Sequence, residues 1–215
     1  MAHVQADEPL IGPNAVIQTA AALTALCGRE AAQRVFAQAG LSRYLTVAPA
    51  AMLPLREVAA LNASLAQTLP PERAAAVAAE AGRRTADYLL ANRIPALAQR
   101  ALRLSPRWLA ARLLLRAIAA NAWTFAGGAR VRGCVTGGAA VVEIDGGATD
   151  ACGCLWRQAV FQRLFAALVN PDAQARAAGC RLGAAPCRYE ITLTPQEGRP
   201  PCTPPSCTPP PCTQT

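Results

Sequence analysis

Apolar residues at helical spacing fill residues 10–121 almost without interruption, and proline and glycine mark where each helix starts and stops. Alanine occupies 50 of the 215 positions, whereas aromatic residues make up only 5% of the chain. Helices of this composition approach one another closely, because small side chains keep their axes near. We predict helices that open at these five positions: Pro13, Arg29, Pro54, Pro70 and Pro106.

The pattern after Asn121 is typical of strands. Short runs with aromatic or β-branched residues alternate with glycine pairs, as antiparallel hairpins require. We expect strands over these ranges: 122–126, 130–136, 139–144, 174–182 and 187–194. A helix over 155–169 separates the third strand from the fourth. The sequence therefore predicts an α+β fold, in which a helical N-terminal half is followed by an antiparallel sheet with one packed helix.

The charge of the chain is strongly positive, and arginine supplies all of it. The formal net charge is +8 and the isoelectric point is near 9.4, which favours an anionic partner: nucleic acid, acidic lipid or a small carboxylate. We find no nucleic-acid-binding module, so we expect no nucleic-acid partner. Because lysine is absent and His3 is the only histidine, Schiff-base chemistry, a Walker-type loop and a Ser-His-Asp triad are excluded.

Composition divides the chain into three parts. Residues 1–9 are polar and lack the apolar segment of a secretory signal, so we expect a flexible N-terminus. Residues 10–194 form a single domain, and residues 195–215 form a disordered tail rich in proline and cysteine. Arginines interrupt the apolar stretch over 108–125, which argues against a membrane-spanning helix. We expect a cytoplasmic protein, with the periphery of a membrane as an alternative location.

Several segments resemble the bacteriochlorophyll 4-vinyl reductase family, which acts in bacteriochlorophyll synthesis in phototrophs. They are LIGPNA at 10–15, TADYLLANRIP at 85–95, AWTFAG at 122–127 and CLW at 154–156, and the resemblance covers about residues 9–193. It implies a fold related to aromatic-responsive sensor domains and to trafficking-complex subunits that hold a hydrophobic ligand in a channel. It also implies reduction of the ring vinyl group of a divinyl chlorophyllide or protochlorophyllide, near the photosynthetic membrane.

Four cysteines in the last third of the domain are candidate metal ligands. The resemblance implies zinc binding through Cys154, Cys180 and Cys187, and Ala177 stands where sensor relatives have an acidic ligand. Cys152 is the available substitute. Thiolates hold zinc tetrahedrally, and four of them would make a closed, structural site. The alternative is that these cysteines are buried thiols without metal.

The sequence leaves the catalytic step open. Vinyl reduction needs a hydride donor, and we find no dinucleotide motif, flavin motif or iron–sulfur spacing. The reductant is therefore unknown, and whether the chain is an enzyme stays open. One alternative is a tetrapyrrole carrier that presents the pigment to a separate reductase. Another is a structural protein that binds other enzymes of the pathway.

For a tetrapyrrole ligand we expect an apolar cavity between the helices and the sheet. Trp123 and Phe125 are candidates for contact with the ring, Tyr88 for a hydrogen bond or a catalytic proton, and Arg93 for the propionate carboxylate. The alternatives are that both aromatic rings belong to the core and that Arg93 is a solvated helix end.

Overall fold

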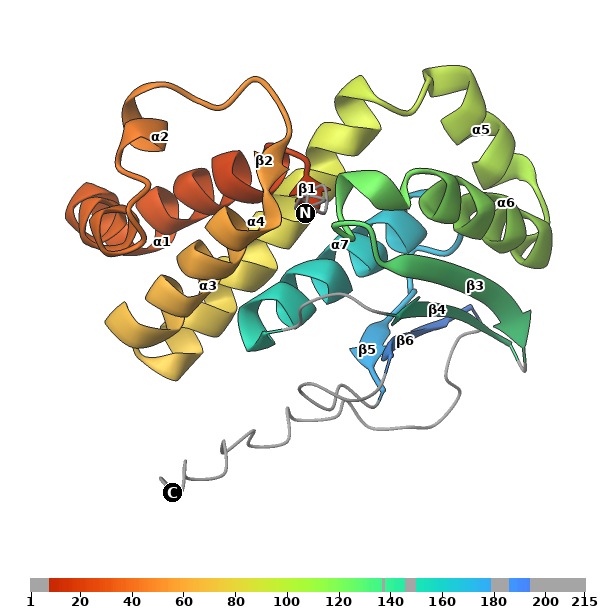
Figure 1. The fold of residues 1–215 in the computed structure, drawn as a ribbon. Helices are drawn as coiled ribbons and strands as arrows, with labels where there is room; N and C mark the ends of the chain where they lie inside the picture. Colours follow the sequence, from red (N-terminus) through yellow and green to blue (C-terminus); the bar gives the residue numbers. More distant parts are fainter. Residues whose placement is uncertain (1–7, 137, 146–149, 179–185, 194–215) are drawn as a thin grey trace, which may run out of the picture.

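The computed structural model describes residues 8–136, 138–145, 150–178 and 186–193 (Figure 1). The tail, the first seven residues and Cys180 lie outside this range. The helices are α1 (Asn14–Gln38), α2 (Arg43–Thr46), α3 (Leu55–Thr68), α4 (Pro71–Asn92), α5 (Ala96–Leu104), α6 (Arg107–Ala120), the 3₁₀ helix η1 (Ala122–Thr124) and α7 (Ala151–Leu168). The strands are β1 (Leu10–Ile11), β2 (Leu53–Pro54), β3 (Arg130–Thr136), β4 (Ala139–Asp145), β5 (Ala175–Ala177) and β6 (Cys187–Thr192). The predicted α+β architecture is confirmed.

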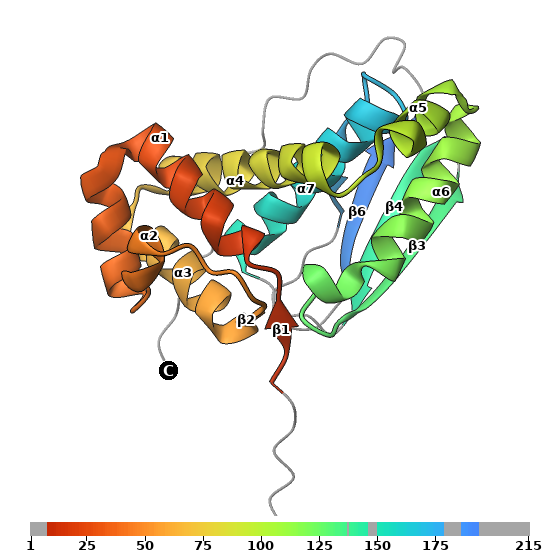
Figure 2. The ribbon, with the colours of Figure 1, turned by 90° about the horizontal axis from the view of Figure 1, so that it is seen from above.

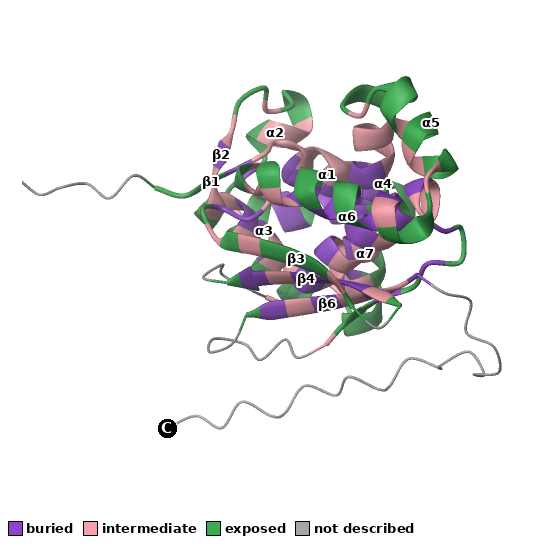
Figure 3. Cartoon of the chain, turned by 90° about the vertical axis from the view of Figure 1, so that its right-hand side faces the viewer, coloured by how far each residue is buried: buried purple, intermediate pink, exposed green. Residues whose placement is uncertain are grey.

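The main sheet is antiparallel, with strand order β3-β4-β6-β5. Helices α6 and α7 lie over one of its faces, which is the face that carries the core residues (Figure 3). The alternating residues that fill this face of β4 and β6 are Ala140, Val142, Ile144, Cys187, Tyr189 and Ile191. The period of two along each strand thus directs one set of side chains to the helices and the other set away from them. Strands β1 and β2 form a separate two-stranded sheet.

Buried residues form two clusters, which we name the N-terminal core and the sheet core. The N-terminal core is built by α1, α3 and the first part of α4. The sheet core is built by α6, most of α7 and the strands β4 and β6. Figure 2 shows α4 and α7 passing between the two groups of elements. Both helices contribute buried side chains to both cores and so join the two halves of the domain.

Three sequence-based predictions of secondary structure need correction. Residues 122–126, expected as a strand, contain η1, because local hydrogen bonds from Phe125 and Ala126 to the Ala122 carbonyl close a tight turn there. A helix, α5, follows Pro95, where we expected none, since proline suits the first turn of a helix. The expected strand over 174–182 is only the short β5 in the described residues. The break predicted at Gly28 is confirmed, since α1 consists of two helical segments that meet in a kink at this residue, whose φ of 84° is not helical.

The contact between α4 and α7 is closest at Gly82, which is buried in the middle of α4. A Cβ at this position would collide with the Trp156 carbonyl oxygen and would lie 2.9 Å from the Ala159 Cβ. Backbone and Cβ of α7 therefore occupy the space that any larger side chain would need.

We predict that Gly82→Ala lowers the free energy of unfolding by about 2 kcal/mol, as overpacking of a filled core does. Steric overlap with α7 must outweigh the gain of about 1 kcal/mol that alanine brings to a helix interior. Chemical denaturation measures the change. Ala76→Ser, at an exposed position of the same helix, is the control and should stay within about 0.5 kcal/mol of wild type. Equal stability of Gly82→Ala and wild type would contradict the close contact.

Candidate functional site

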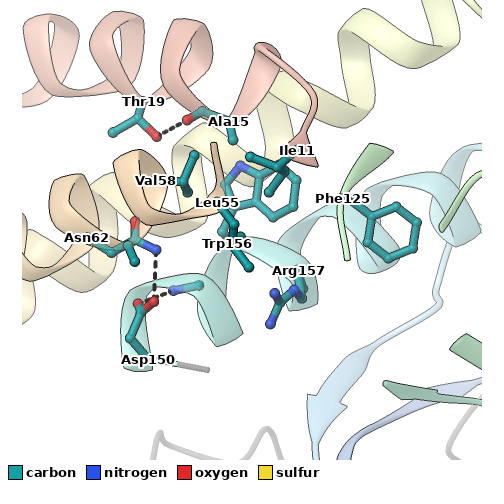
Figure 4. A pocket seen from close by; sticks show the side chains of 12 residues that line it. Ile11, Ala15, Thr19, Leu55, Val58, Asn62, Phe125, Asp150, Trp156 and Arg157 are labelled. Carbon is teal, nitrogen blue, oxygen red and sulfur yellow. Dashed lines mark hydrogen bonds between the residues drawn. The ribbon is translucent and has the colours of Figure 1, made fainter. Parts of the chain in front are cut away.

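A small pocket lies where the N-terminal core and the sheet core meet (Figure 4). Its lining comes from β1, α1, α3, α7 and the segment that follows η1. Trp156 stands at the junction itself, since its partly buried side chain packs against both cores. The pocket encloses about 30 Å³, room for a single water molecule. Pockets that hold drug-sized ligands measure about 300–1,000 Å³, so the expected macrocycle-sized cavity is not present at this junction.

Three of the sequence segments that carry the family resemblance converge on this pocket. Ile11 comes from LIGPNA, Phe125 from AWTFAG and Trp156 from CLW, and all three line it. Close contacts hold the first two segments in place. The Gly12 amide donates a hydrogen bond to the Thr124 carbonyl at 2.7 Å.

Glycine is needed at Gly127 for the same junction. Its φ of 58° lies in the left-handed region, and a Cβ there would come within 2.7 Å of Leu55 Cδ2 on α3. The motif that follows α6 is thus packed against the N-terminal half of the domain. Three of the four resemblance motifs thus meet around the pocket, and the segment at 85–95 does not reach it.

Arg157 is the unusual residue of the pocket. It lines the pocket and is only 5% exposed, yet it makes no hydrogen bond or ion pair with any described residue. Its Nη1 atom is completely buried without a partner. Because a buried charge without a partner is costly, such a group is a strong candidate for binding an anion. Figure 4 shows the Arg157 guanidinium and the Trp156 indole leaving α7 in different directions.

Two further polar atoms are buried in this part of the domain. One is the indole Nε1 of Trp156, which also lines the pocket, and the other is the hydroxyl of Tyr189 on β6. Burial raises the pKa of Tyr189 well above its ordinary value, and the nearby Cys154 adds to this effect, whereas Arg157 opposes it. The phenol is therefore protonated at neutral pH. Tyr189 thus has Cys154 as a neighbour in the sheet core, whereas Arg157 Nη1 and Trp156 Nε1 have no hydrogen-bond partner within the described residues.

Asp150 fixes the start of α7 beside the pocket. One carboxylate oxygen accepts a hydrogen bond from the Gly153 amide at 2.7 Å, which caps the helix, and the other accepts one from Asn62 Nδ2 at 3.0 Å. The pair joins α3 to α7. Sequence reasoning did not single out Asn62, Arg157 or Trp156 as site residues. An aspartate three residues before a glycine at a helix start was the available signal for the cap.

The four residues predicted to bind the ligand are placed differently from one another. Phe125 lines the pocket and meets Phe161 edge-on, with ring centroids 6.0 Å apart. Trp123, in η1, is 59% exposed. Arg93 is exposed at the C-terminal cap of α4, and Tyr88 is half-buried one turn before it. Of these four residues, only Phe125 is part of the pocket.

The predicted cysteine ligands are partly brought together. Cys154 Sγ and Cys187 Sγ lie 3.9 Å apart in the sheet core, although 33 residues separate them in the chain. Cys152 faces the N-terminal core instead, because residues two apart on a helix point about 200° away from each other. Burial, with a smaller effect of Asp150, raises the pKa of the Cys152 thiol to about 11. Cys180 lies outside the described residues.

Comparison with curated proteins places the chain in a family. It is 44% identical over 188 residues to the bacteriochlorophyll synthase 23 kDa chain of Cereibacter sphaeroides, covering 84% of this chain and 89% of that protein. It is 36% identical over 193 residues to the protein of the same name from Rhodobacter capsulatus, covering 87% and 89%. The chain belongs to the bacteriochlorophyll synthase 23 kDa chain family. No protein-family model matches the sequence.

Solved structures share the fold of this family member at low sequence identity. An H-NOX protein from S. oneidensis in the Fe(II)NO ligation state superposes with a TM-score of 0.52 and 12% identity, covering 86% of this chain and 99% of that one. A triple mutant of an H-NOX protein from S. oneidensis in the Fe(II) state gives a TM-score of 0.51 and 13% identity, covering 87% and 98%. The likeness to a sensor-type domain agrees with the fold that the sequence resemblance implied. Among the described residues, no helix is both long and apolar enough to cross a membrane.

We predict that Arg157→Met raises the free energy of unfolding by about 1 kcal/mol in the absence of ligand. Methionine replaces a buried charge that has no partner with an apolar chain of similar length. Thermal and chemical denaturation measure the change. Arg34→Met, at an exposed position of α1, is the control and should have little effect. A loss of stability at Arg157→Met larger than that at Arg34→Met would mean that the guanidinium stabilises the domain.

Proposed function

We propose that this chain takes part in bacteriochlorophyll biosynthesis as the protein that binds a carboxylate-bearing tetrapyrrole intermediate at the Arg157 pocket. The family relationship supports the pathway, since both curated relatives carry the name bacteriochlorophyll synthase 23 kDa chain. The observation that carries the binding site is the buried guanidinium of Arg157, which has no partner.

A chlorophyllide-type pigment matches the chemistry of this pocket. Its propionate carboxylate can accept two parallel hydrogen bonds from a guanidinium, and such a pair is strong where water is excluded. Phe125 and the Trp156 indole supply aromatic surface beside Arg157 for the flat ring. Arg93 and Trp123 are exposed, so they would contact the ligand only near an entrance.

The pocket has to open before it can admit a macrocycle, because its closed volume is about 30 Å³. Opening would have to leave α4 and α7 in place, because both helices contribute buried side chains to both cores. The contact that would part is the one between the end of β1 and η1, where the Gly12 amide donates a hydrogen bond to the Thr124 carbonyl. The solved protein of the same fold is an H-NOX protein in the Fe(II)NO ligation state, so this fold accommodates a ligated iron in that protein.

Two roles are compatible with pigment binding at this site. In the first, the chain is a carrier that presents the intermediate to a separate enzyme of the pathway. In the second, it supports reduction of the ring vinyl group; Tyr88, the proton donor expected from the sequence, does not line the pocket, so the donor for this role is unassigned. The convergence of the resemblance motifs on the pocket favours a ligand for both roles. We favour the carrier role, because binding a carboxylate through Arg157 needs no hydride donor, whereas vinyl reduction does.

We predict that chlorophyllide shifts its Soret absorption band when titrated with this protein, and that Arg157→Met weakens the binding about 10- to 100-fold. The loss corresponds to a charge-assisted pair worth about 1.5–3 kcal/mol. Arg34→Met is the matched control and should bind like wild type. The methyl ester of chlorophyllide lacks the carboxylate, so wild type and Arg157→Met should bind it equally weakly.

Three outcomes of this titration are informative. No spectral change with wild type would overturn pigment binding. Equal affinities of wild type and Arg157→Met for chlorophyllide would move the site away from this pocket. Conversion of a divinyl pigment to its monovinyl form when a reductant is supplied would assign the chain the reductase role in place of the carrier role.

Zinc binding by the cysteines is a separate proposal. Two thiolates on a tetrahedral zinc ion with bonds of about 2.3 Å stand about 3.8 Å apart. The separation of 3.9 Å between Cys154 and Cys187 fits this geometry. Cys152 does not share their side of α7, and no group of three or more potential ligands is present among the described residues. The ion would fasten α7 to β6 in a structural role.

We predict that purified protein contains zinc, and that Cys154→Ser and Cys187→Ser each lower the zinc content by more than half. Elemental analysis measures the content, and a lower melting temperature should accompany the loss. Cys152→Ser is the matched control, because this buried cysteine faces the other core. Wild type without zinc after expression with added zinc would remove the proposal.

A further inference from the structure

The α5–α6 corner, which we define as residues 97–113, exposes large apolar side chains to solvent. Leu97 is 82% exposed, Leu104 78%, Trp108 54% and Leu113 43%. Among the described residues of α5 none is buried, and Figure 3 shows the helix exposed or intermediate along its length. Single exposed leucines are common on protein surfaces. Four large exposed apolar side chains within two successive helices are instead typical of a surface that binds another molecule or a membrane.

The orientation of α5 is fixed by its other side. Gln99 Nε2 donates hydrogen bonds to the carbonyl oxygens of Leu90 and Ile94, at 2.6 and 2.8 Å, and Leu102 packs against the sheet core. These contacts hold one face of α5 against the domain. Leu97 and Leu104 are seven residues apart, two turns of helix, and so share the opposite face. The leucines are therefore presented outward by a helix that is anchored from behind.

The charge around this corner has a single sign. Between residues 88 and 142 the chain has eight arginines and no aspartate or glutamate. All eight arginines are exposed, and none forms an ion pair with a described residue. Arginines elsewhere in the domain do pair, for example Arg83 with Glu80 and Arg188 with Glu143. Four of the eight lie within the corner itself, namely Arg100, Arg103, Arg107 and Arg112, and their positive charge is available for an external anion.

Trp108 combines both properties at the centre of the corner. Its ring lies 5.5 Å from the guanidinium carbon of Arg112, in a cation–π arrangement. Tryptophan with arginine is characteristic of surfaces at a membrane boundary, where the ring enters the headgroup layer and the cation stays with the phosphates. Apolar and basic side chains are interspersed along one short helix and the start of the next, as on helices that lie in a bilayer interface.

We propose that the α5–α6 corner docks the protein on the surface of an anionic lipid bilayer. The exposed leucines and Trp108 enter the headgroup region, and Arg100 and Arg107 pair with lipid phosphates. A purely polyanionic partner such as nucleic acid would use the arginines but leave the leucines in water, so lipid is the occupant that accounts for both. None of the pocket-lining residues belongs to α5 or α6, so docking and ligand binding use separate surfaces.

Co-sedimentation with vesicles tests the proposal. Full-length protein should bind vesicles of phosphatidylcholine with about one third phosphatidylglycerol and should not bind pure phosphatidylcholine vesicles. Raising the salt concentration to about 0.5 M should release most of it, because exposed charges are screened. The variant R100E/R107E should bind the anionic vesicles at least tenfold more weakly. R34E/R73E changes the net charge equally at exposed positions of α1 and α4 and should bind within twofold of wild type.

The apolar contribution has its own variant. Leu104→Ser with Trp108→Ser should weaken vesicle binding at least fivefold, whereas Val47→Ser, a control at a residue that is 70% exposed elsewhere, should not. Circular dichroism checks that every variant is folded. Equal losses in R100E/R107E and R34E/R73E would show that net charge alone drives adsorption and would overturn the proposal. So would binding to a single-stranded oligonucleotide with no binding to vesicles.

Discussion

The close contact between α4 and α7 is the constraint on which the rest of the domain depends. At Gly82 the α7 backbone takes the place of a side chain, so the two helices lie against each other without an intervening layer. As a result α7 is surrounded by packing partners and contributes to both cores. Neighbouring positions along this one helix therefore serve different tasks. Cys152 faces one core and Cys154 the other, and Trp156 and Arg157 stand at the boundary between them.

A boundary between two cores is also where a buried charge can persist. Arg157 costs folding free energy, because its guanidinium has lost water without gaining a hydrogen bond from any described residue. The apolar packing of the two cores on either side stabilises the domain and offsets the free-energy cost of burying this guanidinium. A ligand carboxylate would recover it on binding, which turns a destabilising residue into a source of affinity. Trp156, whose indole nitrogen also has no hydrogen-bond partner among the described residues, lines the same pocket.

The sequence predicted the fold class and most of the helices, since proline at first turns and apolar spacing are local signals. It failed at η1, where Trp123 and Phe125 have strand-forming side chains but backbone hydrogen bonds to Ala122 close a turn. The residues of the pocket were harder to predict from the sequence than the fold. Arg157 follows Trp156 in a helix whose apolar spacing was read correctly, and an arginine beside a core position normally lies at the surface. Its burial depends on the elements that pack around α7 in the folded domain, and no local pattern encodes this.

The exclusive use of arginine links the two functional surfaces. A guanidinium is more weakly hydrated than an ammonium group and offers donors in a fixed plane, so it suits both the buried position of Arg157 and the proposed pairing with lipid phosphates at the α5–α6 corner. A tetrapyrrole with a large apolar ring partitions into bilayers, so a protein that resides on the membrane surface meets this ligand at a higher local concentration. The pocket and the α5–α6 corner have no residue in common, so docking leaves the pocket residues uncovered by the docking helices. The tetrapyrrole would then enter where the N-terminal core and the sheet core separate, while α5 and α6 stay on the membrane.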